Sequence, residues 1–441
     1  MIQEMTRARA AQIKDPVFRE YAHMYLDIYD DFTAQAERMG LPFCKEQEAG
    51  SKELREELRK MGISSRCDGA SLVYGWLSPA CQACKRGIGM VTSYISFQCH
   101  RHCFFCFNPN QDNFLSHLDQ KNDWRGELEQ IKGQGGRLSY IALTGGEPLL
   151  YPEETAAFFK KAGALFPGAH RRLYTSGDLL TEGILERLKE TGLEEIRFSY
   201  KIEDDHILKE KILHLMELAK RCIPSVMVEM PVMPDAQEEM ESLLRRLDDM
   251  GISGINLLEL GFPFYNAEAF LAKGYRLRYP PFKTLYDLSY AGGLPVAGSE
   301  LVALKLLYYA AKEKLGIGVH YCSLENKNFG QRYQQNQVLG RGGDDTMFFS
   351  ERDHYLKTIK AFGEDGAAAY RIFQQAGVCG YRYDRGTRSI QFHPDNAVLL
   401  KDHPIGLAIS VNVMEERGGE LFIRELKLQS AQAADCRREA L

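Results

Sequence analysis

Three cysteines lie close together in the segment Cys99-His-Arg-His-Cys103-Phe-Phe-Cys106. Thiolates at this spacing can bind three irons of a [4Fe-4S] cluster. Because such clusters normally take four cysteine ligands, one iron would stay open to another ligand. The thiols alone also leave open a zinc site as the alternative. The preceding residues, 91–98, are rich in β-branched and aromatic side chains and are predicted to form a strand, so the cysteines would follow its carboxyl end.

A second candidate binding segment follows the next predicted strand. Residues 138–144 are predicted to form that strand, and Gly145-Gly146-Glu147-Pro148 comes directly after it. Glycine has no side chain, so the first two residues allow a ligand to approach the backbone closely, and a carboxylate follows them. Alone, the segment could be an ordinary turn. Its place one strand and one helix after the cysteines favours a shared site.

From residue 91 onward, segments that favour strands alternate with segments that favour helices. The predicted strands are 91–98, 138–144, 171–176, 195–200, 225–230 and 253–260. Such alternation is typical of an α/β fold in which helices cover parallel strands. Six units fit a partial (β/α)6 barrel of the TIM type better than a closed eightfold barrel. The chemistry of such barrels lies at the carboxyl ends of the strands, where both candidate segments fall.

Together, the C-x3-C-x2-C motif and the downstream Gly-Gly-Glu-Pro resemble the radical S-adenosylmethionine (SAM) superfamily, over about residues 91–260. The resemblance implies a [4Fe-4S] cluster on Cys99, Cys103 and Cys106, with SAM chelating the open iron through its amine and carboxylate. It also implies that the Gly-Gly-Glu-Pro segment binds the amino group of SAM. An electron donor such as flavodoxin or ferredoxin would be a partner.

Further residues are candidates for SAM contacts by the same resemblance. Members of the superfamily often carry an aromatic residue just before the last cysteine, near the adenine, and Phe105 holds that position; packing around a dry cluster is a compatible role. Ser199, on the fourth predicted strand, is a candidate for the ribose or carboxylate. Glu229 is a carboxylate within an apolar run on the fifth strand, and the alternative for it is an outward-facing charge. On the sixth strand, Asn256 and Glu259 fall on opposite faces unless the strand bends.

A second pair of cysteines lies upstream, in the loop-like segment 66–90. Cys81 and Cys84 form a C-x2-C motif, whose two thiolates can bind one metal ion from a single turn. Cys322, near His320, is the preferred residue for completing an auxiliary iron or iron–sulfur site with them. The alternatives are plain thiols for the cysteines and a hydrogen-bonded buried side chain for His320. Because the pair lies only about fifteen residues before the first motif, we expect this loop near the same barrel mouth.

Composition and charge limit the partners and the compartment. The 441 residues are 44% hydrophobic, enough for a large core, and their formal net charge is −5 without a long basic run. Nucleic acid is therefore not expected as an obligatory partner. No apolar stretch approaches the roughly eighteen residues of a membrane span, and the first residues lack the apolar centre of a signal peptide. We expect a cytoplasmic protein without a membrane partner, whose eleven cysteines are metal ligands or thiols.

The predicted organisation has several parts. They are a helical N-terminal extension (1–65), a cysteine-containing loop (66–90), the partial barrel (91–265), a C-terminal helical and then α+β region (266–430) and a loose tail (431–441). Helical spacing of apolar residues in the first part and strand signals near the C-terminus support this division. The parts outside the barrel would close over a substrate.

The resemblance implies a radical enzyme. Its cluster would cleave SAM reductively, and the 5′-deoxyadenosyl radical would abstract hydrogen from a substrate, for which a peptide or protein side chain is favoured. The segments Cys81-Gln-Ala-Cys84, Asn256-Leu-Leu-Glu-Leu260 and His320-Tyr-Cys322 resemble, more narrowly, a group similar to the cobalamin-dependent methanogenesis-marker arginine C-methyltransferase. Cobalamin-dependent C-methylation is therefore one alternative, although no D-x-H-x-x-G motif supports that cofactor. An activase that installs a glycyl radical on a partner enzyme is another, and a non-enzymatic metal or electron-transfer protein is a further one.

Overall fold

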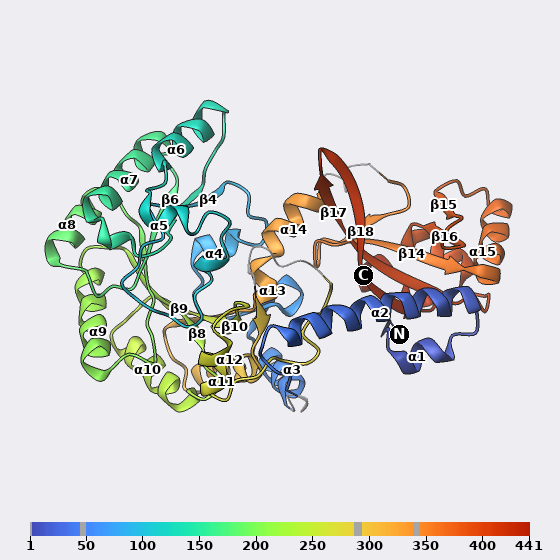
Figure 1. The fold of residues 1–441 in the computed structure, drawn as a ribbon, viewed down its shortest axis with the longest axis horizontal. Coiled ribbons are helices and arrows are strands. Elements are labelled where there is room, and N and C mark those ends of the chain that lie inside the picture. The colour runs from blue at the N-terminus through green and yellow to red at the C-terminus, as the bar shows by residue number, and fades with distance from the viewer. Residues whose placement is uncertain (1, 45–49, 286–292, 338–343) are drawn as a thin grey trace. The chain divides into compact units, whose positions relative to one another are not determined.

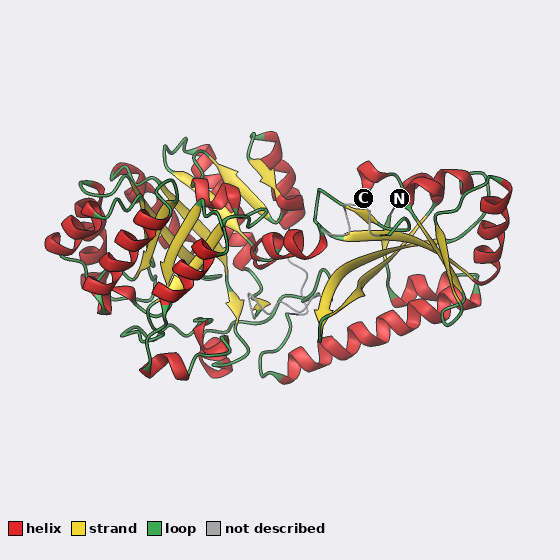
Figure 2. Ribbon diagram, turned by 90° about the horizontal axis from the view of Figure 1, so that it is seen from above, coloured by secondary structure: helices red, strands yellow, loops and turns green. Residues whose placement is uncertain are grey.

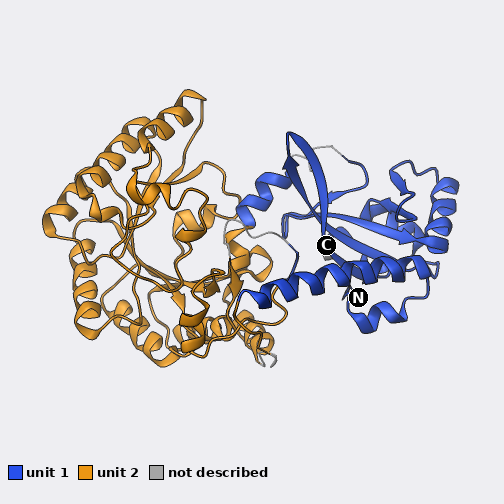
Figure 3. Ribbon diagram, in the orientation of Figure 1, with its two compact units in different colours: residues 1–39, 282–287, 329–441 blue, residues 40–281, 288–328 orange. Residues whose placement is uncertain are grey.

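The computed structural model describes residues 2–44, 50–285, 293–337 and 344–441. The chain divides into two compact units (Figure 3). The first, called the barrel unit, comprises residues 40–281 and 288–328. The second, called the sheet unit, comprises residues 1–39, 282–287 and 329–441. In the described part of the chain, no helix is both long and apolar enough to cross a membrane.

The described residues of the barrel unit form one sheet in the order β2-β3-β12-β9-β8-β7-β6-β5-β4. Its strands are β2 (Ser64–Arg66), β3 (Ser71–Tyr74), β4 (Met90–Tyr94), β5 (Tyr140–Thr144), β6 (His170–Thr175), β7 (Glu195–Phe198), β8 (Ser225–Val232), β9 (Gly254–Glu259) and β12 (Gly318–Cys322). All neighbours from β4 to β12 are parallel, whereas β3 is antiparallel to both β12 and β2. The six predicted strands and the open, partial barrel are confirmed, and β12 adds a further parallel strand.

Helices surround these strands in Figure 1. They are α3 (Ser51–Lys60), α6 (Trp124–Gly133), α7 (Pro152–Leu165), α8 (Glu182–Glu190), α9 (His206–Lys220), α10 (Gln237–Asp249) and α12 (Ser299–Lys312). Helix α10 shows why they pack there: Met240, Leu243, Leu244 and Leu247 recur at helical spacing and are all buried. Shorter elements are α4 (Pro79–Ala83), α5 (Ser116–Asp119), α11 (Ala267–Ala272), α13 (Leu324–Lys327) and the antiparallel pair β10 (Gly261–Phe262) and β11 (Leu294–Pro295).

The sheet unit is an antiparallel sheet with helices against it (Figure 2). Its strands are β1 (Gln3–Glu4), β13 (Phe348–Phe349), β14 (Leu356–Phe362), β15 (Tyr381–Asp384), β16 (Ser389–Phe392), β17 (Leu407–Arg417) and β18 (Glu420–Ala431), and its helices are α1 (Arg7–Gln12), α2 (Pro16–Arg38), α14 (Phe329–Asn336) and α15 (Gly363–Gln375). Asp15 caps α2 by accepting from the backbone N–H groups of Val17 and Phe18. The Phe18 ring stacks on Phe362 of β14, with 4.8 Å between the centroids, and so fixes α2 on the sheet.

The observed units correct the predicted division. The stretch 1–65 is not one extension, because residues 1–39 belong to the sheet unit and the rest to the barrel unit. Residues 66–90 are more than a loop, since they contain β3 and α4, and β3 completes the barrel sheet beside β12. The predicted region 266–430 is divided between the units as well. Finally, the predicted tail 431–441 ends in two short 3₁₀ turns with Cys436 buried, so it is not loose.

Candidate functional site: the cysteine loop and the barrel interior

The cysteines Cys99, Cys103 and Cys106, called the cluster-loop cysteines, follow β4 and line one cavity of about 580 Å³. The opposite wall of this cavity comes from the carboxyl ends of the parallel strands, including Thr144 at the end of β5 and Thr175 at the end of β6. The structure thus brings the two candidate segments of the sequence to the same end of the barrel, as its parallel topology requires.

The glycines of the second segment allow it to lie directly on the backbone that leads to the cysteines. The N–H of Glu147 donates to the Gln98 carbonyl at 2.8 Å. A Cβ on Gly146 would lie 1.9 Å from that same oxygen, so no larger residue fits without a shift. Gly145 has a φ of +111°, a backbone conformation that side-chain-bearing residues avoid. Gly145, Gly146 and Glu147 line the cavity, while Pro148 is buried at the start of a 3₁₀ turn.

The carboxylate of Glu147 is held by the protein itself. Its oxygens accept from the hydroxyl of Thr175, the N–H of Ser176 (each 2.7 Å) and the N–H of Leu149 at 3.0 Å. Only 3% of the residue is exposed. Glu147 therefore joins its own loop to the end of β6. Because the protein already occupies its carboxylate, a ligand in the cavity would contact the backbone of this loop.

The remaining candidate residues of the cavity are also brought together. Phe105, Ser199 and Glu229 all line it. Glu229 points inward, which excludes the outward-facing alternative, and its Oε2 accepts from Nη1 of Arg197 at 2.6 Å and from Nδ2 of Asn256 at 2.8 Å. These two hydrogen bonds fix the Glu229 side chain at the cavity wall.

The donor set at the cavity fits an iron–sulfur cluster. Burial raises the pKa of the Cys99 and Cys106 thiols, so binding of iron would have to displace their protons. Among the described residues, no three His, Cys, Asp or Glu side chains are grouped so that they could hold one metal ion. A [4Fe-4S] cluster does not need such convergence, because each cysteine binds a different iron.

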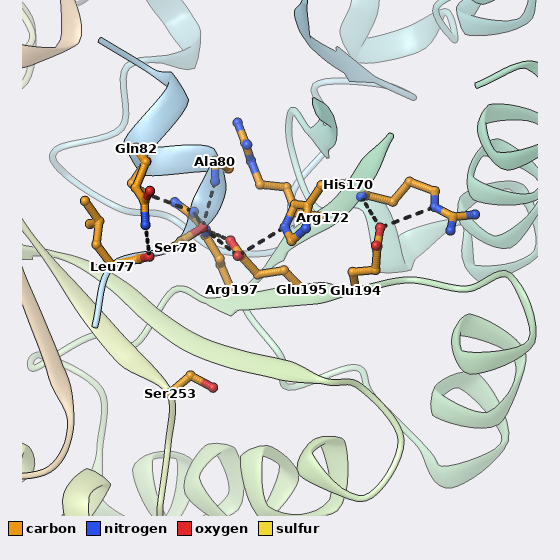
Figure 4. Close-up of polar contacts among 12 residues, drawn as sticks. Leu77, Ser78, Ala80, Gln82, His170, Arg172, Glu194, Glu195, Arg197 and Ser253 are labelled. Atoms are coloured by element: carbon orange, nitrogen blue, oxygen red, sulfur yellow. Dashed lines mark hydrogen bonds and ion pairs between the residues drawn. The ribbon is translucent and has the colours of Figure 1, made fainter. Parts of the chain in front are cut away.

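A buried ionic network occupies the other end of the barrel interior (Figure 4). Ser78, which caps α4, donates to Oε2 of Glu195 at 2.6 Å, and Nε of Arg197 donates to Oε1 at 2.5 Å. His170 lies 3.2 Å from the same carboxylate. Burial is the largest single effect and opposes the charge, but the Arg197 guanidinium and these hydrogen bonds together outweigh it and lower the pKa of Glu195 to about 2.

This network shows where the C-x2-C segment enters the barrel. Glu195 is the first residue of β7, and a Cβ on Gly318, the first residue of β12, would lie 2.1 Å from the Trp76 carbonyl. The chain before α4 thus crosses the amino ends of the strands. The segment thus enters the barrel from the end opposite the reaction cavity, because that cavity lies at the carboxyl ends of the parallel strands.

Cys81, Cys84 and Cys322, called the interior thiols, belong to α4, its C-cap and β12. Sγ of Cys81 accepts from Nη2 of Arg197 at 3.3 Å and from Nδ2 of Asn256 at 3.5 Å. Burial raises the pKa of Cys84, and it raises that of Cys322 to about 12. Burial is the largest cause of both shifts, and the neighbouring Cys81 adds to each.

His320 does not serve this group as a ligand. Its Nδ1 lies 2.9 Å from Oδ1 of Asn256 and its Nε2 lies 2.8 Å from Oγ of Ser71, so both ring nitrogens are occupied. Burial lowers its pKa to about 3, which keeps the ring neutral. The hydrogen-bonded alternative is confirmed for His320. The auxiliary metal site at the interior thiols stays a prediction.

Sequence reasoning missed the cations beside these thiols. Arg172 is 7% exposed, and its Nη1 has no hydrogen-bond partner in the structure. Arg172 and Arg197 both lower the pKa of Cys84, against the larger effect of burial. A signal was present: Glu195 and Arg197 alternate in a strand predicted to be buried, and alternate charges in such a strand indicate a polar barrel interior.

Comparison with known proteins defines the class. Residues 93–247 match the Radical SAM superfamily, and the matched stretch holds the cluster-loop cysteines and the strands β5 to β8. The barrel unit therefore contains a radical SAM domain, the kind of domain that uses a [4Fe-4S] cluster and SAM. Over 274 residues the chain is 29% identical to a Methanocaldococcus jannaschii protein named, provisionally, a glycyl-radical enzyme activating enzyme. That alignment spans 60% of this chain and 68% of the relative.

Solved structures show weaker similarity. SuiB of Streptococcus suis bound to SAM is 14% identical, with a TM-score of 0.37 over 62% of this chain and 54% of that chain. Coproporphyrinogen III oxidase of Escherichia coli is 16% identical, with a TM-score of 0.36 over 54% of this chain and 56% of that chain. The chain spans little more than half the length of either structure, and similarity at this level carries no argument about the substrate.

Proposed function

We propose that this enzyme acts on a side chain or backbone position of a peptide or protein. The observation that supports a shared reaction site is the single cavity lined by the cluster-loop cysteines and Gly145 to Glu147. The cysteines would hold the [4Fe-4S] cluster, and the loop backbone, with Phe105 and Ser199, would hold SAM. When bound, this pair supplies reductive cleavage of SAM and a 5′-deoxyadenosyl radical that abstracts hydrogen from the substrate.

The chain's own residues position the reactants and limit water. Glu147 fixes the loop against β6, so the backbone that faces SAM is rigid before binding. Aromatic side chains around the cysteines, among them Phe97, Phe105 and Phe107, cover the cavity with apolar surface. Such a wall protects a reactive species from solvent. Glu229 is available at the cavity wall, held by Arg197, to orient a polar group of SAM or substrate.

The name of the Methanocaldococcus jannaschii relative supports a second candidate function. In that function the protein is an activase that forms a glycyl radical on a partner enzyme. An activase acts on a protein, so the name of this relative also supports a peptide or protein, rather than a small metabolite, as the substrate. Cobalamin-dependent methylation is the remaining branch. A corrinoid absorption spectrum in the purified protein supports that branch, and its absence after growth with cobalamin argues against it.

One experiment tests the class and separates the candidates. The protein, reconstituted anaerobically with iron and sulfide, is incubated with dithionite and SAM. We expect 5′-deoxyadenosine and methionine from the wild type and none from Cys103→Ala. Wild-type protein with an intact cluster and no 5′-deoxyadenosine would overturn the proposal. Adding proteins encoded beside this chain's gene then distinguishes an activase, which produces a glycyl-radical electron paramagnetic resonance (EPR) signal on the partner, from an enzyme that changes the partner's mass.

A further inference from the structure

The residues between the first two cluster-loop cysteines form ion pairs of their own. Arg101 lies between Cys99 and Cys103, and its Nη1 donates to Oδ2 of Asp178 at 3.1 Å. Its Nη2 binds the carboxylate of Asp204. The three side chains are only 10% to 13% exposed, so solvent screens these pairs less than it screens surface pairs.

The two carboxylates come from different barrel strands. Asp178 follows the carboxyl end of β6, and Asp204 follows that of β7, just before α9. A guanidinium presents several N–H donors in a fixed plane, so one arginine can join two carboxylates and hold them at a set separation. Nε2 of His100 adds a second contact to Asp178 at 2.8 Å. The cysteine loop is thereby attached to the ends of both strands.

Asp178 also connects this loop to the candidate SAM loop. Oγ of Ser176 lies 2.6 Å from Oδ1 of Asp178 and 2.7 Å from Oε2 of Glu147. Since a hydroxyl has one proton, Ser176 donates to one of the two carboxylates at a time. A continuous path therefore runs from Arg101 through Asp178 and Ser176 to Glu147.

We propose that Arg101, clamped by Asp178 and Asp204, is a positioning residue that sets the cysteine loop relative to the SAM loop. It touches neither reacting atom in this role. Its loss would let the three thiols move independently of Gly145 to Glu147. The expected effect of Arg101 on SAM binding rests on the proposed function. The expected effect of Arg101 on the mobility of the three thiols does not depend on a bound cluster.

The test compares Arg101→Ala, Arg101→Lys and Asp204→Asn with Arg221→Ala, a matched exposed arginine just after α9. In the metal-free protein, the rate of iodoacetamide labelling is measured for each cysteine by peptide mass spectrometry. We expect Arg101→Ala to label the cluster-loop cysteines about fivefold faster than the wild type, by analogy with other local opening reactions. Lysine keeps the charge but cannot span both carboxylates, so an intermediate rate is expected.

In the reconstituted protein, SAM affinity and the EPR signal of the reduced cluster are measured with and without SAM. We expect Arg101→Ala to bind SAM roughly tenfold more weakly, a coupling of ordinary size, and to show a smaller SAM-induced change in its EPR signal. Wild-type labelling rates and SAM affinity in Arg101→Ala would overturn the inference. If Arg101→Ala does not fold, Asp204→Asn decides by the same readouts. A wild-type protein that assembles no cluster contradicts the proposed function, and the labelling rates still decide the inference.

Discussion

Sγ of Cys81 lies 3.3 Å from Nη2 of Arg197, inside a barrel whose reaction cavity opens at the carboxyl ends of the strands. The same guanidinium donates to Glu195 and Glu229. One buried cation therefore contacts three parts of the barrel. They are Cys81 of the C-x2-C segment, Glu195 at the amino end of the sheet and Glu229 of the cavity wall. A change at this position should affect all three.

Replacing Arg197 with glutamine should destabilise the barrel unit by about 3–5 kcal/mol, because it leaves the buried Glu195 and the partly buried Glu229 without their main partner. Unfolding by urea can be followed by tryptophan fluorescence, since the chain's two tryptophans, Trp76 and Trp124, belong to the barrel unit. The exposed Arg245→Gln variant is the control, with an expected loss below about 1 kcal/mol. A loss that small for Arg197→Gln would contradict the assignment.

The low pKa of Glu195 predicts a specific pH dependence. Its folded pKa of about 2 lies below the ordinary value of 4.5 for a glutamate side chain. The ionised carboxylate thus contributes stability above pH 4.5, roughly 3 kcal/mol, which is lost as the pH falls toward 2. The difference in unfolding free energy between wild type and Glu195→Gln should be largest near neutral pH and decrease below about pH 4.5. A pH-independent difference for Glu195→Gln would refute the prediction.

Gly146→Ala should disturb the SAM loop. The added Cβ would lie 1.9 Å from the Gln98 carbonyl, so one of the two loops must move, at a cost of about 1–3 kcal/mol. We expect loss of SAM binding with the iron content largely kept. Gly183→Ala, in α8 with open space around it, is the matched control and should stabilise by up to about 1 kcal/mol. Normal SAM affinity in Gly146→Ala would show that this contact is not required.

The interior thiols can be tested for metal separately. A variant with alanine at all three cluster-loop cysteines retains Cys81, Cys84 and Cys322. If those thiols bind metal, it should still bind iron or zinc after reconstitution, and further replacement of Cys84 should remove it. Cys379→Ala, at an exposed thiol, serves as the control. A metal-free triple variant would reject an auxiliary metal site.

The sequence allowed the barrel and its reaction cavity to be predicted because their signals are local. Each parallel strand has its own apolar run, and the cysteines and glycines stand directly after strands whose carboxyl ends must meet. Glu229 lines the cavity, but the alternation along one strand could not decide which face was inside, so the sequence left its position open. That choice depends on Arg197 and Asn256, which lie on other strands.

The position of the C-x2-C segment could not be predicted in the same way. Its placement depends on β3 pairing with β12, whose sequences lie far apart, and on Ser78 reaching Glu195 at the amino end of β7. Neither pairing has a local signal. For the same reason β12 was assigned to a C-terminal region, although it completes the parallel sheet beside β9.

The sheet unit is assembled from both ends of the chain, which has a consequence for synthesis on the ribosome. Helix α2 emerges from the ribosome well before its partners β14 and β18, which follow more than three hundred residues later. The strands and helices of the barrel unit are complete before then. During synthesis the barrel unit should therefore fold first. Until β14 and β18 are made, the apolar face of α2 stays uncovered, and we expect chaperones to bind this helix.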